Sequence, residues 1–419
     1  LSHVFQRMKI TRLFLQFLFV GVLAIGLQVS AQAQSPTAHG NEWIDYNKTY
    51  YKLKVVNTGL HRLSYGFLDS LGLAGTNPQH FQLFRRGKEV AIHVAGEADG
   101  RLDGEDFVEF YGERNDGRLD QDLYKNPAHQ PHQLYSLYTD TAAYFLAINP
   151  AGGKRMQQVN PSPAGKTPEP YVLQKVTQFF TNVYTEGQTH GALTKSLLSW
   201  MDQGEGYLSA PYLRSQNLIV SAVANKSTSG SKPMLEIGLV GANANTQSGV
   251  VNVVTTSGTR QVAQFQFGGY GFQSAKGELE LTDIAANNTV TIQLIPNAGQ
   301  SSSVRVAYIR ITYPQRTELL GNSMLIFTDS TQSVNPYFNI SGTTANTIAY
   351  DASDPYNPIR IEGHVAGNNK GFVVQTQARS HKILIANSLK PFKALSKVEV
   401  LRFRNIKANE HNYIIVTNR

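Results

Sequence analysis

The sequence predicts an all-β protein made of tandem β-rich domains, including a β-sandwich of the jelly-roll or immunoglobulin-like type. Strand-like runs recur seven times between residues 217 and 313, separated by clusters of Gly, Asn and Ser, which is the rhythm of a β-sandwich. In one run Val290, Ile292 and Leu294 alternate with polar residues, as expected of a strand with one buried face. The 35 Gly and 17 Pro in 419 residues indicate a turn-rich chain.

Short runs of β-branched and aromatic residues, bounded by turn residues, predict strands along the rest of the chain. In the first part they lie at residues 50–55, 60–65, 81–84, 90–94, 107–111 and 144–148, with one short helix at 67–73 and an extended segment at 171–184. The sandwich strands lie at 218–223, 234–240, 250–255, 262–267, 279–281, 290–295 and 304–313, and later strands at 324–327, 347–350, 372–375, 382–386 and 398–403. Apolar residues change parity within 304–313, which predicts a β-bulge or a strand buried on both faces.

A length of 419 residues predicts two or three domains, at roughly 150 residues each. We expect a first β-rich domain at residues 41–150 and a linker at 151–170, where Pro and Gly are frequent and large apolar residues are few. The β-sandwich domain is expected at 171–315 and a further β-rich extension at 316–408. An apolar run at 413–416 is typical of a buried parallel strand.

The N-terminus predicts a cleaved signal peptide at residues 1–33. Arg7, Lys9 and Arg12 form a basic segment, an apolar run follows at 13–27, and small residues give a cleavage pattern near Ala33. A membrane anchor is the alternative, but polar residues break the run before the roughly 20 apolar residues that a spanning helix needs. The sequence therefore predicts export to the periplasm, the outer membrane or the cell surface, with no membrane span in the mature chain.

Composition and charge limit the chemistry available to the chain. It contains no Cys, which excludes disulfides, thiolate metal sites and cysteine nucleophiles within these residues. The net charge of +8 includes three basic residues of the predicted signal peptide, and the remaining excess is spread thinly. The densest basic cluster, Arg85, Arg86 and Lys88, lies between apolar runs and predicts a solvated hairpin end rather than a nucleic-acid interface.

One short motif is repeated. The segment from Asp99 to Asp103, with sequence DGRLD, recurs from Asp116 to Asp120. Closely spaced carboxylates of this kind begin calcium loops, but an arginine occupies the third ligand position in both copies. Phe110 stands where the first copy would need a bidentate glutamate. We interpret the repeat as a pair of Asx turns on either side of a strand, with calcium binding as the alternative.

No other residue group has the spacing of a catalytic or metal site. His129, His132 and His381 are interpreted as ordinary surface histidines. Asp202 and Glu205 lie in a Gly-rich segment and are interpreted as solvated acids of a tight turn, because a glycosidase needs two carboxyl groups that face each other across a sugar. The glycines at 268–271 lack the residues that follow a phosphate-binding loop and predict a turn. The sequence therefore assigns no catalytic, cofactor-binding or metal-binding residue.

Several phrases of the sequence resemble a known family in the family's own order. They are EW at 42–43, LFRRGKE at 83–89, GEADG at 96–100, VEFYG at 108–112, RNDG at 114–117, YSLYTDT at 135–141, DQGEG at 202–206 and AYIRITYP at 307–314. These phrases resemble the N-terminal region of PorU-type proteins, the sortases of the Bacteroidetes type IX secretion system, which are built on a gingipain-type cysteine peptidase domain. The likeness covers nearly the whole mature chain.

The resemblance implies that β-rich N-terminal domains precede the peptidase domain, whose first strand is similar to residues 412–418 here. We therefore expect residues 409–419 to begin a truncated gingipain-type domain. The catalytic His and Cys of the family lie beyond that strand, so no catalytic residue is carried over to this chain, although the full-length family protein would be a cysteine-type endopeptidase or sortase. The expected partners are the chain's own peptidase domain or components of type IX secretion.

Three functions are consistent with these observations. The first is the non-catalytic N-terminal portion of a sortase-like protein involved in type IX secretion and attachment to the cell surface. The second is a secreted carbohydrate-binding β-sandwich, for which Trp200, Tyr207, Tyr270 and Phe272 are candidate contacts, although core or turn positions would also explain them. The third is an adhesin. The family phrases and the run at 413–416 favour the first.

Overall fold

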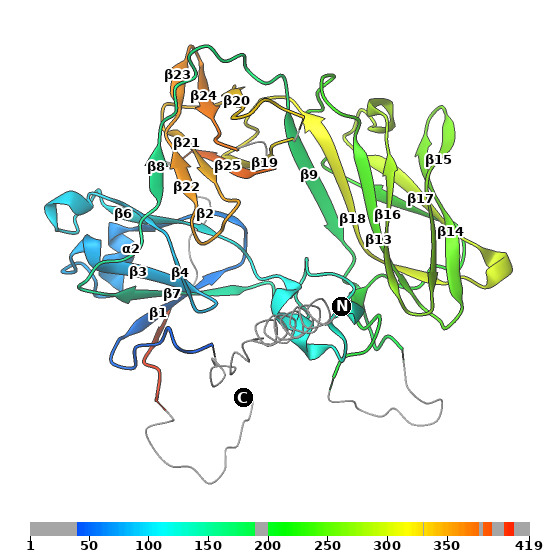
Figure 1. Cartoon of the computed structure of the whole chain (residues 1–419), viewed down its shortest axis with the longest axis horizontal. Coiled ribbons are helices and arrows are strands. Elements are labelled where there is room, and N and C mark those ends of the chain that lie inside the picture. The colour runs from blue at the N-terminus through cyan, green and yellow to red at the C-terminus, as the bar shows by residue number, and fades with distance from the viewer. Residues whose placement is uncertain (1–39, 189–199, 330, 377–379, 388–397, 406–419) are drawn as a thin grey trace, which may run out of the picture. The chain divides into compact units, whose positions relative to one another are not determined.

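The computed structural model describes residues 40–188, 200–329, 331–376, 380–387 and 398–405 (Figure 1). The chain divides into two compact units, residues 1–46 and 47–419, and the strands of the described part all belong to the second. Its architecture is all-β, as predicted. Within these ranges no helix is long and apolar enough to cross a membrane. The predicted signal peptide at 1–33 and the predicted start of a peptidase domain at 409–419 lie outside the described residues.

Two sheets share an apolar core in the N-terminal part of the second unit. The first sheet has five strands in the order β26 (Glu399–Leu401), β1 (Tyr50–Val55), β7 (Ala142–Ile148), β3 (Phe81–Arg85) and β4 (Lys88–Val90). The second sheet has three strands in the order β2 (Gly59–Ser64), β6 (Phe107–Gly112) and β5 (His93–Ala95). The last described strand of the chain, β26, thus pairs with the first, β1.

Local signals set the first helix and hairpin. The Ser64 hydroxyl accepts a hydrogen bond from Phe67 N, so α2 (Tyr65–Ser70) begins two residues before the predicted helix, and Gly72 with a φ of 76° follows its end. β3 and β4 form the predicted hairpin. Its turn consists of Arg86 and Gly87, with φ of 46° and 76°, as a two-residue type I′ turn requires.

The predicted β-sandwich is present. One sheet has four antiparallel strands in the order β12 (Gln216–Val220), β17 (Val290–Pro296), β14 (Thr246–Thr255) and β15 (Gly258–Gly268). The facing strands begin a nine-stranded sheet in the order β16 (Phe272–Glu278), β13 (Met234–Gly241), β18 (Val304–Gln315) and β9 (Val172–Phe179). Figure 1 shows β13, β16 and β18 beside β14, β15 and β17.

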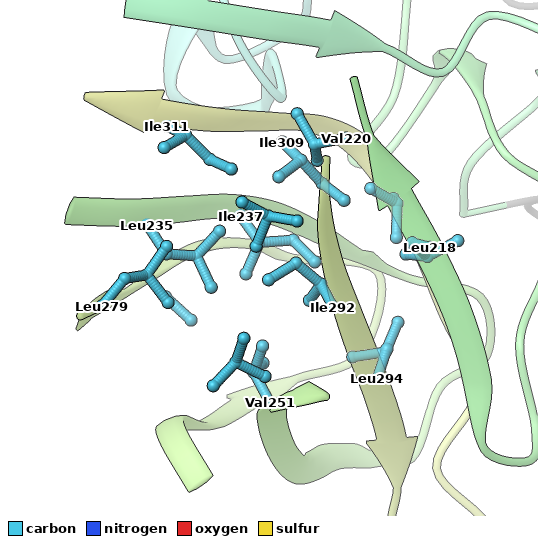
Figure 2. Packing of buried hydrophobic residues seen from close by; sticks show 14 of the residues in the cluster. Leu218, Val220, Leu235, Ile237, Val251, Leu279, Ile292, Leu294, Ile309 and Ile311 are labelled. Carbon is cyan, nitrogen blue, oxygen red and sulfur yellow. The ribbon is translucent and has the colours of Figure 1, made fainter. Parts of the chain in front are cut away.

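The two sheets bury one apolar core between them. In Figure 2, Ile237 and Ile309 of the nine-stranded sheet and Ile292 of the four-stranded sheet point into the same space, and all three are fully buried. Val290, Ile292 and Leu294 are buried while the residues between them are half-buried, so the predicted alternation in this strand is confirmed. The apolar residues that recur at every second position are therefore those on the buried face of the strand.

The predicted β-bulge lies at Ala307 in β18. Gly238 of β13 pairs with Tyr308, but the next residue, Leu239, pairs with Val306, so Ala307 is skipped. The skipped residue explains why the apolar parity changes along this strand. Gly238 is required here, because a Cβ at that position would lie 2.6 Å from the ring of Tyr308.

One predicted sandwich strand is wrong. Residues 279–281 were expected to be a strand, but Leu281–Asp283 is a 3₁₀ helix and the strand before it is β16. β16 escaped prediction because two of its residues are the small Ala275 and Gly277 in place of large apolar residues. A Cβ at Gly277 would lie 2.1 Å from the carbonyl oxygen of Val262, so close contact with β15 excludes a larger side chain. The turn predicted at 268–271 is found between β15 and β16.

The C-terminal strands continue the nine-stranded sheet. Beyond β9 follow β19 (Ser323–Phe327), β25 (Lys382–Asn387), β21 (Thr347–Asp351), β22 (Ile359–Ile361) and β8 (Gln157–Val159). A three-stranded sheet of β20 (Tyr337–Ile340), β24 (Asn369–Val373) and β23 (His364–Ala366) shares a core with them. A two-stranded sheet consists of β10 (Val183–Thr185) and β11 (Gly206–Leu208). The further 3₁₀ helices are Pro78–His80, Glu97–Asp99, Gly117–Leu123, Pro127–His129 and Ala298–Gln300.

The segment expected to be a linker includes β8, which pairs in parallel with β22. The Arg155 guanidinium, just before β8, donates hydrogen bonds to the Glu97 carboxylate at 2.7 Å and to four backbone carbonyls. Residues 160–169 are mostly exposed and contain no strand. The domain boundaries drawn from the sequence stay a prediction.

Limited proteolysis tests those boundaries. We expect trypsin to cut after Lys166 earlier than after Arg155, because a protease must pull its site out of the fold. The side chain of Arg155 bonds a carboxylate and several carbonyls, whereas Lys166 Nζ bonds one carbonyl, that of Asn335. Mass spectrometry of the first fragments would show a product that begins at Thr167. Earlier cleavage after Arg155 would contradict a boundary at 160–169.

Candidate functional site

The repeated DGRLD segments form turns. Asp99, Asp103 and Asp116 each accept a hydrogen bond from the backbone N–H two residues later, at 2.9, 3.4 and 3.1 Å. These are Asx turns on either side of β6, as predicted. Asp120 is buried and accepts from Leu137 N at 2.8 Å. In the described ranges no group of three or more His, Cys, Asp or Glu side chains is arranged to hold a metal ion.

Asp202 and Glu205 form the predicted tight turn, but the prediction that both acids are solvated is wrong for Asp202, which is buried. Glu205 N donates to the Asp202 carbonyl at 3.2 Å, and Asp202 N donates to Glu205 Oε2 at 2.9 Å. The other carboxylate oxygen, Glu205 Oε1, accepts from the Tyr184 hydroxyl at 2.5 Å. A cavity of about 20 Å³ beside Glu205 and Tyr207 has room for a water molecule and not for a sugar. The two acids thus belong to one turn.

The histidines expected at the surface are not alike. His129 ends a 3₁₀ helix. The prediction of an ordinary surface residue is wrong for His132, which is half-buried against the edge of the Tyr308 ring at a centroid distance of 5.7 Å. Its Nδ1 accepts from Leu134 N at 3.1 Å. The partner ring lies on β18, far away in sequence, so no local pattern could indicate the burial.

His381 is also half-buried, within a group that contains Asp351 and Ser353. His381 Nδ1 lies 2.5 Å from Asp351 Oδ2, and the Ser353 hydroxyl donates to Asp351 Oδ1 at 2.6 Å. A serine nucleophile needs its hydroxyl at the free ring nitrogen of the histidine. Here that nitrogen, Nε2, faces the Thr376 carbonyl at 3.1 Å. The group has the residue types of a catalytic triad, but the serine bonds the aspartate and not the histidine, so the hydrogen bonds are those of a structural cluster.

The basic cluster at 85–88 is engaged within the protein. Arg85 was expected at a solvated hairpin end, but it is 2% exposed, and this expectation is wrong. Its Nη1 donates to Glu113 Oε2 at 2.7 Å, while Lys382 Nζ donates to Glu113 Oε1 at 2.5 Å. Arg86 pairs with Asp116 at 2.8 Å. A carboxylate between two cations explains how the guanidinium is buried without a large penalty.

A second buried ion pair lies on β6, four residues before Glu113. Glu109 is fully buried and accepts from Arg62 Nη2 at 2.6 Å and from the Tyr350 hydroxyl at 3.0 Å. Tyr350 belongs to β21, and Lys382 to β25, so Glu109 in β6 and Glu113 directly after β6 both bond strands of the C-terminal part. One apolar cluster also contains residues of both parts, including Leu60, Tyr111 and Ile348. We call Arg62, Arg85, Glu109, Glu113, Tyr350 and Lys382 the β6 network.

The pKa of Glu113 shows which influence dominates in the β6 network. Burial alone would raise the pKa of its carboxyl group. The ammonium of Lys382 and the guanidinium of Arg85 outweigh burial and hold the pKa below its usual range. Glu113 therefore stays ionised and bonds both cations.

Two histidines make stability depend on pH. Burial, together with nearby arginines, lowers the pKa of His93 and of His132 to about 4. The unfolded chain, with a histidine pKa of about 6.5, binds more protons than the folded chain between pH 6.5 and 4. The stability from neutral histidines is therefore fully present above that window and is lost as the pH falls through it, at about 1.4 kcal/mol for each unit of pKa shift.

We expect the free energy of unfolding, measured with urea, to fall between pH 7 and pH 5. The variant His132→Asn keeps an acceptor for Leu134 N but does not titrate, so its loss over the same range should be smaller. Equal losses in both proteins would exclude His132 as a source of the pH dependence.

The candidate carbohydrate contacts differ in exposure, and one of them, Tyr270, lies beside Gly204 of the segment that carries Trp200 and Tyr207. Trp200 and Tyr207 are exposed, at 39% and 36%. Phe272 packs with the buried Tyr308 in a small core cluster, and Tyr270 lies in the turn between β15 and β16. Sequence reasoning missed Tyr138 and Tyr184, which are exposed near Tyr207, because the exposure of an aromatic residue has no local signal.

Comparison with known proteins gives one informative likeness. No protein-family model and no curated protein matches the sequence. The crystal structure of dimeric latent PorU from Porphyromonas gingivalis is similar with a TM-score of 0.62 at 12% sequence identity, over 87% of this chain and 34% of that chain. A structure of infectious bursal disease virus Gx strain reaches a TM-score of only 0.18 at 8% identity, over 84% of this chain and 83% of that chain, and carries no argument. The chain spans about a third of the length of the PorU structure, and at this identity the likeness concerns the fold alone. Over most of its length the chain has a PorU-like fold.

Proposed function

We propose that this chain is the non-catalytic N-terminal portion of a PorU-like protein, in which β-rich domains position a gingipain-type cysteine peptidase domain during type IX secretion and attachment to the cell surface. The observation that carries the proposal is the PorU-like fold over 87% of the chain. The phrases at 83–89, 108–112 and 307–314 support it from the sequence. The proposed location is the periplasm, the outer membrane or the cell surface.

The pairing of β26 with β1 suits a positioning role. Glu399 of β26 lies 3.2 Å from Lys52 Nζ and 2.6 Å from Lys54 Nζ. Phe403 packs against Tyr50 and Phe145, with ring centroids 5.2 and 5.8 Å apart. A domain that follows residue 405 in a PorU-like protein would leave from a segment that is held on the five-stranded sheet.

An activity assay tests the non-catalytic part of the proposal. The purified chain is incubated with peptide substrates, with a peptide and an amine acceptor, and with glycans. We expect no turnover, because the chain has no Cys and because Nε2 of His381, the nitrogen that would activate Ser353, already faces the Thr376 carbonyl. Turnover that a single substitution in this chain abolishes would refute the proposal.

A further inference from the structure

The exposed aromatic side chains of the described residues lie in one region. Tyr138, Tyr184, Trp200 and Tyr207 are 69%, 43%, 39% and 36% exposed. Every other described Phe, Tyr or Trp side chain is buried or half-buried. Exposed tyrosine and tryptophan rings are enriched where proteins bind partners, because a rigid ring gives a large contact area at a low cost in conformational entropy. We call these four residues the aromatic patch.

The β10–β11 hairpin holds the centre of the aromatic patch. Tyr184 pairs directly with Tyr207 across the hairpin, and their ring centroids are 5.2 Å apart. The other face of β11 is packed, since Leu208 is fully buried. The Tyr124 hydroxyl donates to the Glu205 carbonyl at 2.8 Å, which fixes the segment around residue 124 beside the hairpin. The rings are thus placed by backbone pairing before any partner binds.

Tyr138 and Trp200 flank this hairpin. The side chain of Leu137 lies beside Gly206, which places Tyr138 next to β11. Residue 201 exchanges backbone hydrogen bonds with residues 123 and 125, which places Trp200 at the same segment. Lys125 Nζ lies 4.9 Å from the centroid of the Trp200 ring, so one ring of the patch already holds a cation against its face.

The aromatic patch is acidic although the chain as a whole is basic. Its three segments, residues 119–138, 183–188 and 200–208, contain five acids and one lysine, and three of the acids, Asp122, Glu186 and Glu205, are exposed or half-buried. The half-buried carboxylate of Glu205 accepts from the Tyr184 hydroxyl and from Asp202 N, and no ion pair joins it to a Lys or Arg of the described ranges. Each of its oxygens has a second lone pair, so the carboxylate can accept further hydrogen bonds.

We infer that the aromatic patch binds an extended peptide segment that carries Lys or Arg, with the cationic group against Glu205 and the ring faces of Tyr184 and Tyr207. Such a side chain supplies a counter-charge to Glu205, which forms no ion pair with a Lys or Arg in the described part of the chain, and makes cation–π contacts with the rings. A neutral saccharide would stack on the rings but leave the carboxylate uncompensated, and an acidic glycan would be repelled. This inference does not rest on the proposed role in secretion.

An extended partner also fits the edge of the hairpin. Among the described residues β10 pairs only with β11, and Val183 and Tyr184 of β10 are both exposed. The free edge of a strand offers N–H and C=O groups to an added strand. A peptide that pairs with β10 would place alternate side chains on the face that carries Tyr184 and Tyr207.

Peptide titration of the full chain tests the inference. The probe is a fluorescent peptide of alternating Lys and Val, and its matched control replaces each Lys with Glu. We expect saturable binding of the lysine peptide, weaker at high salt, and none of the glutamate peptide. Tyr138→Ala, Glu205→Gln and the double variant Tyr184→Ala with Tyr207→Ala should each weaken binding, the double variant by roughly tenfold or more.

Two controls keep the outcome clear. Val365→Ala changes a side chain that is 72% exposed and lies outside the patch, so it should leave binding unchanged. Tyr138 is so exposed that its replacement should leave the melting temperature unaltered, which separates lost binding from lost folding. Similar binding of both peptides, or binding that no patch variant weakens, would overturn the inference. So would a neutral oligosaccharide, or self-association of the chain, that depends on Tyr138 while the lysine peptide fails to bind.

Discussion

Replacing Glu113 with Ala is expected to lower the free energy of unfolding of the chain by about 3–5 kcal/mol. The carboxylate is the shared partner of Arg85 and Lys382, whose side chains are 2% and 25% exposed. Its removal leaves two cations close together with no counter-charge in a region that water scarcely reaches. Breaking a buried ion pair from one side is costly for this reason, even where the intact pair adds little. Urea titration at pH 7 measures the change.

The matched control for this prediction is Lys232→Ala, which breaks an ion pair and leaves the capping box of Glu280 in place. Lys232 pairs with Glu280 at 2.6 Å, but both side chains are exposed. Exposed pairs contribute little, so no measurable change is expected. If Glu113→Ala destabilises the chain no more than this surface variant, the β6 network does not join the N-terminal sheets to the C-terminal strands in the way that the contacts indicate.

Replacing Ile292 with Ala is expected to cost about 2–5 kcal/mol of stability. Ile292 is fully buried in β17 between the two sheets of the sandwich (Figure 2). The substitution removes apolar contacts and leaves a cavity that the surrounding strands fill only in part. Thermal or urea unfolding of the full chain measures the loss.

The matched control changes the same residue type one strand away. Ile219 lies on β12, the neighbour of β17, but it is 56% exposed. Ile219→Ala should change the stability by less than about 0.5 kcal/mol. Comparable effects of the two substitutions would mean that the sandwich does not have the inner and outer faces described here.

The strands of the sandwich could be predicted because burial on one face leaves a period of two in the sequence. The bulge at Ala307 was predictable for the same reason, since one extra residue shifts that period. β16 was not predictable, because close contact with β15 requires Ala275 and Gly277 in place of large apolar residues. A strand with small inward residues lacks the signal on which such predictions depend.

The charged contacts could not be predicted from local pattern. Lys382 reaches Glu113 across 269 residues, and the burial of Arg85 depends on that same carboxylate. The Asx turns of the repeated motif were predictable, because each bonds a backbone group two residues away. Half of the aromatic patch could be predicted, because the sequence indicated Trp200 and Tyr207 as candidate contacts. Tyr138 and Tyr184 come close to them only in the folded chain.

We propose that these β-rich domains hold a peptidase domain, and binding between the two parts tests this proposal directly. The full chain would be titrated, by isothermal calorimetry, with the separately produced peptidase domain of a PorU-like protein from the same organism. We expect saturable binding in a one-to-one ratio with a Kd below about 10 µM, equivalent to a binding free energy of roughly 7 kcal/mol. An absence of binding at higher concentrations, when both proteins are shown to be folded by their melting transitions, would contradict it.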